Sequence, residues 1–179
     1  MAVVKIVIMS VVAACLYGIA MDQITARVCI EYFTIGHPKI FNTQDPTILA
    51  LGWGIIATWW VGLPLGLLIA ISARAGKQPR WGWRDLVRPL LVLLCIMGAV
   101  SAMAGLAGYL AAQAGMVGLL GPLAHSVPAD RHTAFLADLW AHIAAYASGA
   151  ASGIGLCVWC LIVRNRRRAI ANLIPPARA

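Results

Sequence analysis

The side chains of this sequence that could carry chemistry are histidines and carboxylates beside its long apolar stretches. All four histidines and five of the six carboxylates fall in two such regions. Imidazole and carboxylate groups together suit zinc, iron, manganese or copper better than calcium, which prefers oxygen ligands alone. We therefore expect a site for a divalent transition metal. Its predicted ligands are Glu31, His37, Asp138 and His142, and the residues held in reserve for the same polar site are Asp22, Gln23, Arg27, His125 and His132.

The spacing within this set indicates a metal site only weakly. Asp138 and His142 are four residues apart, so they share one face of a helix. No HExxH, no paired ExxH and no CxxC pair of zinc spacing is present. A hydrogen bond between Asp138 and His142 that ties their helix to the segment after the first span, or simple exposure at the membrane interface, remains an alternative. For His125 and His132 the alternative is a solvated loop position.

A metal with an open coordination position would lower the pKa of bound water and support hydrolysis, or would change redox state beside an apolar substrate. The sequence does not choose between these reactions. It argues against others, because a GxSxG nucleophile signature is absent. A haem would need two axial ligands on facing spans, and His142 is the one histidine expected inside a span.

The composition indicates that helices in a membrane position these residues. Hydrophobic residues make up 61% of the chain, charged residues make up 11%, and the mean hydropathy is +0.84. Transmembrane strands alternate in character, whereas this chain has continuous apolar runs near or above the roughly 20 residues that a bilayer needs. We expect an all-α, four-helix bundle that forms one transmembrane domain over 1–179. Its spans cover about 3–21, 46–73, 89–113 and 133–163, and a basic cytoplasmic tail covers 164–179.

The basic residues orient this bundle. Short loops rich in Lys and Arg stay cytoplasmic, and eleven of the fourteen Lys and Arg residues lie near the start, between the second and third spans, or after the fourth. We expect a multi-pass protein of the bacterial inner (plasma) membrane, with both termini inside and a periplasmic polar site. The net charge of +8 is divided between two juxtamembrane segments. Attraction to the lipid bilayer explains it, and no nucleic acid is expected as a partner.

The ends of the predicted helices carry local signals. Asp45 followed by Pro46 predicts the start of the second span, and Pro89 is expected to open the third. Few residues would break a helix between the first span and Gly36. Helix 1 is therefore expected to continue on the outer side for about three or four turns.

This extension would align Gln23, Arg27 and Glu31 on one helical face, with a weak ion pair between Arg27 and Glu31. Pro38 biases the backbone of His37 toward an extended conformation, which would turn its imidazole over the mouth of the bundle.

Small residues predict close helix packing. Gly149 and Gly153 form a GxxxG ridge in the fourth span, and Gly105 and Gly108 lie in the third. Such residues let helix backbones approach each other where lipid provides no hydrophobic drive. We expect the third and fourth spans to pack together. A homo-oligomer or a membrane partner could use the Gly149/Gly153 ridge.

The segment DQITARVCIEYFTIGHP, residues 22–38, is unusually polar for a connection. It resembles a segment in a family of small, uncharacterised four-span bacterial inner-membrane proteins with similar hydropathy, and the resemblance covers residues of about 17–65. It implies no activity, ligand or catalytic residue.

The function expected first is a metal-binding membrane protein whose site lies at the outer mouth, in one form a metalloenzyme acting on a lipid-soluble or periplasmic substrate. The alternative is a non-catalytic subunit or assembly factor that docks a partner through residues 22–38. A transporter comes third, because no charged residue lies near the centre of any predicted span.

Overall fold

The computed structural model describes residues 1–77 and 79–173, and every regular element within those residues is helical. Four helical stretches are long and apolar enough to cross a membrane, which confirms the prediction of an all-α chain with four apolar spans. Residues 174–179 of the predicted tail lie outside the described residues. The elements are α1 (Ala2–Val28), α2 (Ile30–Thr34), α3 (Pro46–Ile56), α4 (Trp59–Arg74), α5 (Trp83–Gln113), α6 (Pro122–Ser126), the 3₁₀ turn η1 (Ala129–Arg131) and α7 (His132–Leu173).

The first helix is longer than its apolar span, as expected, but it ends at Val28. Cys29 has an extended backbone, with φ −147° and ψ 96°, and α2 starts immediately after it. The prediction that Gln23, Arg27 and Glu31 share one face is therefore wrong. A single non-helical residue rotates Glu31 away from the other two side chains, and Glu31 pairs with Arg131 instead of Arg27.

The predicted second span is a helix in two parts. Asp45 caps α3 as expected, because its Oδ1 accepts the backbone N–H groups of Thr47 at 2.8 Å and Ile48 at 3.0 Å. The helix is interrupted between Ile56 and Trp59. At the interruption the Thr58 hydroxyl donates to the Gly54 carbonyl, and such bonds compete with the helical ladder. The Ala57 carbonyl accepts the Tyr146 hydroxyl of α7 at 3.2 Å.

The third span starts earlier than its proline suggested. α5 begins at Trp83, after Gly82, whose N–H donates to Asp85 Oδ2 at 2.8 Å. Pro89 lies inside α5, so the expectation that it opens the helix is wrong. Asp85 supplies the cap, and Pro89, the seventh residue of α5, removes one backbone N–H donor from the helical ladder.

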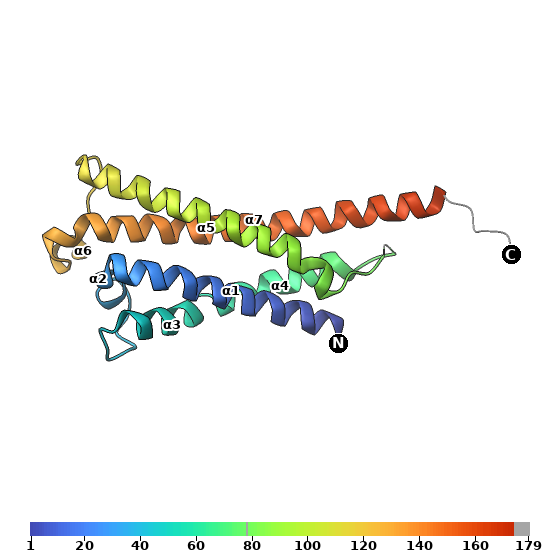
Figure 1. The fold of residues 1–179 in the computed structure, drawn as a ribbon, viewed down its shortest axis with the longest axis horizontal. Coiled ribbons are helices and arrows are strands. Elements are labelled where there is room, and N and C mark those ends of the chain that lie inside the picture. The colour runs from blue at the N-terminus through green and yellow to red at the C-terminus, as the bar shows by residue number, and fades with distance from the viewer. Residues whose placement is uncertain (78, 174–179) are drawn as a thin grey trace.

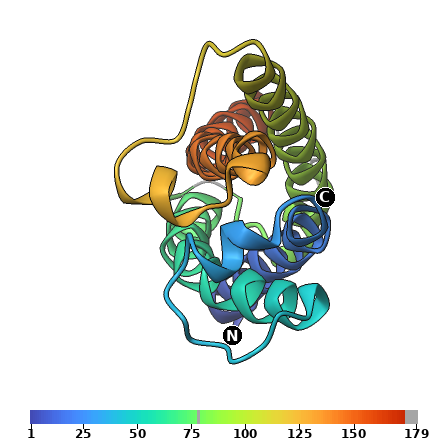
Figure 2. The same ribbon diagram turned by 90° about the vertical axis from the view of Figure 1, so that its left-hand side faces the viewer.

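The helices pack as two pairs, α1 with α3 and α4, and α5 with α7. Figure 2 looks along the bundle from the end that carries α2 and α6 and shows the two pairs side by side. The predicted packing of the third and fourth spans is confirmed, since a Cβ added to Gly108 would lie 2.7 Å from the Trp140 ring. Contacts between α4 and α7 join the pairs.

The closest helix crossing is in the other pair. A Cβ on Gly54 of α3 would lie 2.5 Å from the backbone nitrogen of Ile19, and one on Gly62 of α4 would lie 2.8 Å from the Cα of Val11. Backbones can approach this closely because a glycine on one helix leaves room for the backbone of the other. The GxxxG spacing of Gly62 and Gly66 in the sequence signals this contact as plainly as Gly149 and Gly153 do in α7.

Arg164 of α7 binds the end of α4. Its side chain is fully buried and donates to the carbonyls of Ser72, Ala75 and Pro79, the last two at 2.8 Å. The sequence grouped Arg164 with the basic tail, whereas the structure uses it to join α7 to the last turn of α4 and the segment that follows. α7 continues from there to Leu173.

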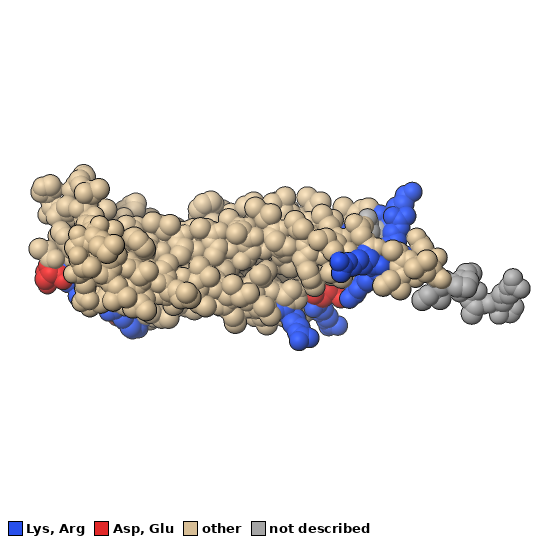
Figure 3. Space-filling model, turned by 90° about the horizontal axis from the view of Figure 1, so that it is seen from above, with Lys and Arg blue, Asp and Glu red and all other residues tan. Residues whose placement is uncertain are grey.

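The two ends of the molecule are built from different elements, and both carry charged side chains. In Figure 1 the N-terminus and the far end of α7 lie toward one end, and α2, α6 and the start of α3 lie at the other. In Figure 3 charged side chains gather toward both ends, and the wide band between them shows none on the face in view. This distribution is typical of a bundle that crosses a bilayer.

Candidate functional site

A cavity of about 140 Å³ lies between the two helix pairs. All four long stretches contribute to its wall, which is mostly apolar and includes the small residues Ala14, Gly62 and Gly149. Along α1 it extends from Ser10 to Asp22, which is about 18 Å at the helical rise of 1.5 Å per residue. Polar side chains concentrate at the Asp22 end, close to α2.

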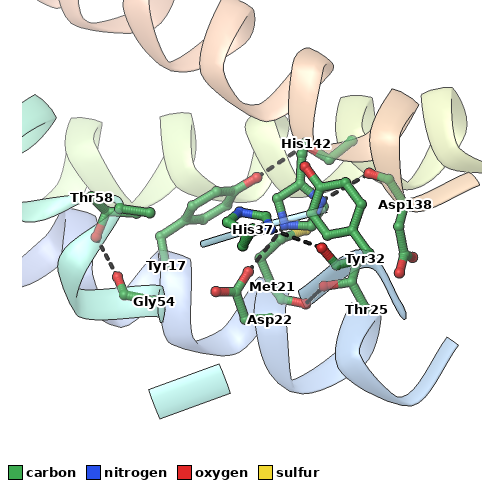
Figure 4. A network of polar contacts seen from close by, with 12 residues as sticks. Tyr17, Met21, Asp22, Thr25, Tyr32, His37, Gly54, Thr58, Asp138 and His142 are labelled. Carbon is green, nitrogen blue, oxygen red and sulfur yellow. Dashed lines mark hydrogen bonds and ion pairs between the residues drawn. The ribbon is translucent and has the colours of Figure 1, made fainter. Parts of the chain in front are cut away.

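Asp22 and His142 form an ion pair at that end, although 120 residues separate them in the sequence. His142 Nε2 lies 3.1 Å from Asp22 Oδ1, and the two side chains are 12% and 8% exposed. His142 Nδ1 donates to the carbonyl of Asp138 at 2.8 Å. A carbonyl only accepts, so Nδ1 carries a proton and a further proton is shared between Nε2 and Asp22. The pair is therefore neutral as a whole, and Figure 4 shows it facing the other polar groups of the site.

His37 joins this end of the cavity from the segment after α2. Its Nδ1 donates to the Tyr32 carbonyl at 2.8 Å, and its ring lies 4.6 Å from the Trp53 ring, centroid to centroid. The Tyr32 ring stacks on the imidazole of His142 at 4.5 Å. Burial lowers the pKa of His37, and the hydrogen bond to Tyr32 opposes this shift only in part. His37 is thus neutral near pH 7, with an unprotonated Nε2.

The structure divides the predicted ligand set between two places. His37 and His142 line the cavity, whereas Glu31 lies outside it and binds Arg131 Nε at 3.1 Å. Burial alone would raise the pKa of Glu31, but hydrogen bonds from its own backbone N–H, from Cys29 and from Arg131 lower it. The Cys29 thiol donates to Glu31 at 3.3 Å, and burial and this bond raise the pKa of Cys29 to about 12, so the thiol is unreactive.

Asp138 is buried, at 2% exposed, but it does not join His142 through its carboxylate. Figure 4 shows the carboxylate pointing away from the His142 ring, and the contact between the two residues uses the Asp138 carbonyl. Four-residue spacing aligned the two residues along α7, as predicted. It did not decide the rotamer, which directs Asp138 away from the shared site. Asp138 Oδ2 has no hydrogen-bond partner among the described residues.

Of the reserve residues, only Asp22 belongs to the site. Arg27 donates to the Gln23 side chain at 2.7 Å and to the Thr47 hydroxyl at 2.9 Å, and these bonds tie α1 to the first turn of α3. His125 and His132 bond to the nearby carbonyls of Gly121 and Val127, each at 3.0 Å. Both lie outside the cavity: His125 is exposed on α6, and His132 is the partly buried first residue of α7, so neither occupies the solvated loop position given above as the alternative.

The prediction of a metal site finds no support. Across residues 1–77 and 79–173, no group of three or more His, Cys, Asp and Glu side chains is arranged to hold a metal ion. The side chains explain this result. Both nitrogens of His142 are already bonded, His37 has only Nε2 left, and Glu31 and Asp138 point elsewhere.

Sequence reasoning ranked Asp22 too low and missed the aromatic part of the site. Tyr17, Tyr32, Trp53 and Tyr146 line the cavity near Asp22 and His142. A usable signal was present for Asp22, since it is the one acid within the apolar continuation of helix 1. An acid in that position requires a partner from another helix.

Models of protein families, curated proteins and solved structures were each compared with the chain, and none of these comparisons finds a match.

Proposed function

We propose that this protein binds a lipid-soluble amphiphile in the cavity between its helix pairs, with the polar head of the ligand at Asp22, His37 and His142. The observation that carries the proposal is the polarity of the cavity, which is apolar along most of its length and ionisable at one end. Binding sites for small molecules combine an apolar wall with a few convergent polar groups in this way.

The dimensions of the cavity suit a ligand with one apolar chain. About 140 Å³ holds roughly ten water-sized groups. The length of about 18 Å along α1 matches an extended chain of comparable size better than a bulky ring system. The interrupted helix supports the same reading, because non-helical backbone at membrane depth is tolerated where it lines a cavity. Ala57 and Thr58 at the interruption are part of the wall.

The proposal places the chain in the bacterial inner membrane with both termini in the cytoplasm and the Asp22 end on the periplasmic side. The basic residues near α1, after α4 and at the end of α7 support this orientation. The proposed function includes no metal. Docking of a partner through residues 22–38 has less support, because Ala26, Cys29 and Phe33 are buried in the bundle.

The binding proposal is tested by filling the cavity. Gly149 lines it, and the nearest atom to an added Cβ there is Met97 Cε at 3.1 Å, so Gly149→Leu should occupy the space that the ligand needs. We expect saturable binding of a radiolabelled dodecyl amphiphile to the wild-type protein in phospholipid nanodiscs, and a loss of at least about tenfold in affinity in the variant. Equilibrium dialysis against empty nanodiscs measures the difference.

Gly155→Leu is the matched control, because Gly155 lies in the same helix, outside the cavity, with open space around it. It should bind as the wild type does. Ala145→Leu, at another cavity position, repeats the test if Gly149→Leu does not fold. Equal saturable binding by the cavity-filling variants and the control would refute the proposal.

The orientation is tested separately with cysteines introduced at Gln44 and Arg84, which are at opposite ends of the bundle and exposed. A membrane-impermeant maleimide added to intact cells should label the cysteine at 44 and leave the one at 84 unlabelled. The reverse pattern would place the Asp22 end in the cytoplasm.

A further inference from the structure

The two imidazoles at the polar end of the cavity already use their donors within the protein. The Nδ1 protons of His37 and His142 are donated to backbone carbonyls, and the remaining proton of the His142 pair lies between Nε2 and Asp22. The same two groups leave acceptors for a ligand. His37 Nε2 carries a lone pair and has no hydrogen-bond partner among the described residues, and Asp22 Oδ2 is in the same position.

Several hydroxyl groups along the wall also donate within the protein. Ser10, Thr58 and Tyr146 each donate to a backbone carbonyl, those of Ile6, Gly54 and Ala57 respectively. Tyr17 shares one hydrogen bond with Ser101 at 3.1 Å. Tyr32 lines the polar end, and its hydroxyl has no hydrogen-bond partner among the described residues. A ligand head that gives a proton and can also accept one, as a hydroxyl does, therefore matches this end of the cavity.

The charged side chains around the cavity limit the choice of ligand head group further. Among the described residues that line the cavity there is no Lys or Arg, and the Asp22–His142 pair is neutral as a whole. A carboxylate or phosphate head would bring a second negative charge beside Asp22, with no cation to compensate it. An ammonium head would likewise bury an uncompensated charge, which costs far more than burying a hydroxyl that is hydrogen-bonded.

We infer that the ligand is a neutral single-chain lipid with a hydroxyl head, a long-chain or isoprenoid alcohol by chemical class, whose hydroxyl donates to His37 Nε2. This inference rests on the proposed function and assigns its ligand. The Tyr32 carbonyl holds His37 in the tautomer that presents Nε2, and the Trp53 and Tyr32 rings fix the plane of the imidazole. The apolar chain then lies along α1 toward Ser10.

Four probes with the same chain and different heads test the inference: 1-dodecanol, methyl dodecyl ether, dodecanoate and dodecylammonium. Binding to the protein in nanodiscs is measured by equilibrium dialysis, with partition into empty nanodiscs subtracted. Dodecanol should bind about tenfold more tightly than the ether, which keeps the oxygen but lacks the proton. The two charged probes should bind more weakly than dodecanol by a similar factor or more.

His37→Phe identifies the acceptor. Phenylalanine keeps an aromatic ring beside Trp53 and removes Nε2. The affinity for dodecanol should therefore fall to the affinity for the ether, and the affinity for the ether should not change. Retention of the full preference for dodecanol in this variant would overturn the role of His37. His125→Phe, on the exposed helix α6, is the matched control and should bind all four probes as the wild type does.

The possible failures are distinct. If none of the probes binds saturably, the proposed function fails. If probes bind and are excluded by Gly149→Leu, but the ether or a charged head binds as tightly as dodecanol, the proposed function stands and the assignment of a hydroxyl head is wrong.

Discussion

His37 connects the chemistry of a single residue to the stability of the bundle end that carries α2. It lies outside the spanning helices, and burial, opposed in part by the bond to Tyr32, lowers its pKa. The folded pKa is thus below the unfolded value of about 6.5. Between the two values the unfolded chain binds more protons than the folded chain. The stabilisation from neutral His37 is fully present above about pH 6.5 and is lost as the pH falls through the folded pKa.

We predict that His37→Asn weakens the destabilisation caused by acid, because the amide can donate to the Tyr32 carbonyl and does not titrate. The fall in Tm between about pH 7.5 and about pH 5.5, measured in detergent, should be smaller in the variant than in the wild type. Asp22 and His142 face His37 and remain in both proteins, so their contributions enter both measurements. His125→Asn should keep the wild-type fall, and an unchanged fall in His37→Asn would contradict the prediction.

Cys29 shows how one residue redirects an element. Its extended backbone ends α1 and starts α2 in a new direction, so Tyr32 and Phe33 turn into the bundle while Glu31 meets Arg131. The segment that a continuous helix would have carried outward folds back over the cavity. His37 reaches the site only because of this break.

The crossing of α1 with α3 gives a prediction about elements. Gly54→Ala would place a Cβ 2.5 Å from the nitrogen and 2.6 Å from the Cα of Ile19, and neither backbone atom can move without separating the helices. We expect the variant to lose about 1–3 kcal/mol of unfolding free energy, as overpacked sites do. Thermal unfolding in detergent would measure the loss.

Gly98→Ala is the matched control for that experiment. Gly98 lies within α5, and an added Cβ there meets no atom within 4 Å. Removing a glycine from a helix interior should leave stability unchanged or raise it by up to about 1 kcal/mol. If both variants had the same unfolding free energy, the close approach of α1 and α3 would not determine the stability of the bundle.

The whole molecule consists of two helix pairs joined mainly through α4 and α7, with the cavity between them. Arg164 strengthens that joint at the end opposite to Asp22 by binding three carbonyls after and within the last turns of α4. Polar links between helices of the two pairs elsewhere include Asp22 to His142, Tyr17 to Ser101, and Tyr146 to Ala57. Two of these lie beside the interrupted helix or the polar end of the cavity.

We predict that Arg164→Met destabilises the assembled bundle by about 3 kcal/mol, because the side chain keeps its apolar stem while buried carbonyls lose a charged donor. Chemical denaturation followed by tryptophan fluorescence should show a lower midpoint. Arg168→Met removes an exposed arginine of the same helix and should change stability by less than about 0.5 kcal/mol. Equal midpoints for the two variants would mean that Arg164 does not hold the pairs together.

The sequence alone determined much of the helical architecture, through the apolar runs, the Asp45 cap and the segregation of charge. The apolar runs predict helices, because a long apolar run must satisfy its own backbone hydrogen bonds within the bilayer. These features also predicted that His37 and His142 belong to a polar site at one end of the bundle, and the structure places both residues at the same end of the cavity.

Only the tertiary structure decided which polar groups meet there. Glu31 does not belong to the site because the break at Cys29 changes the helical face on which it lies. Asp138 does not belong to it because its rotamer directs the carboxylate away from His142. Asp22 does belong to the site, because the packing of α1 against α7 brings it to His142 although the two residues are far apart in the sequence. Periodicity determines which residues share a face of one helix, whereas pairing across helices depends on breaks, rotations and crossing distances set by packing.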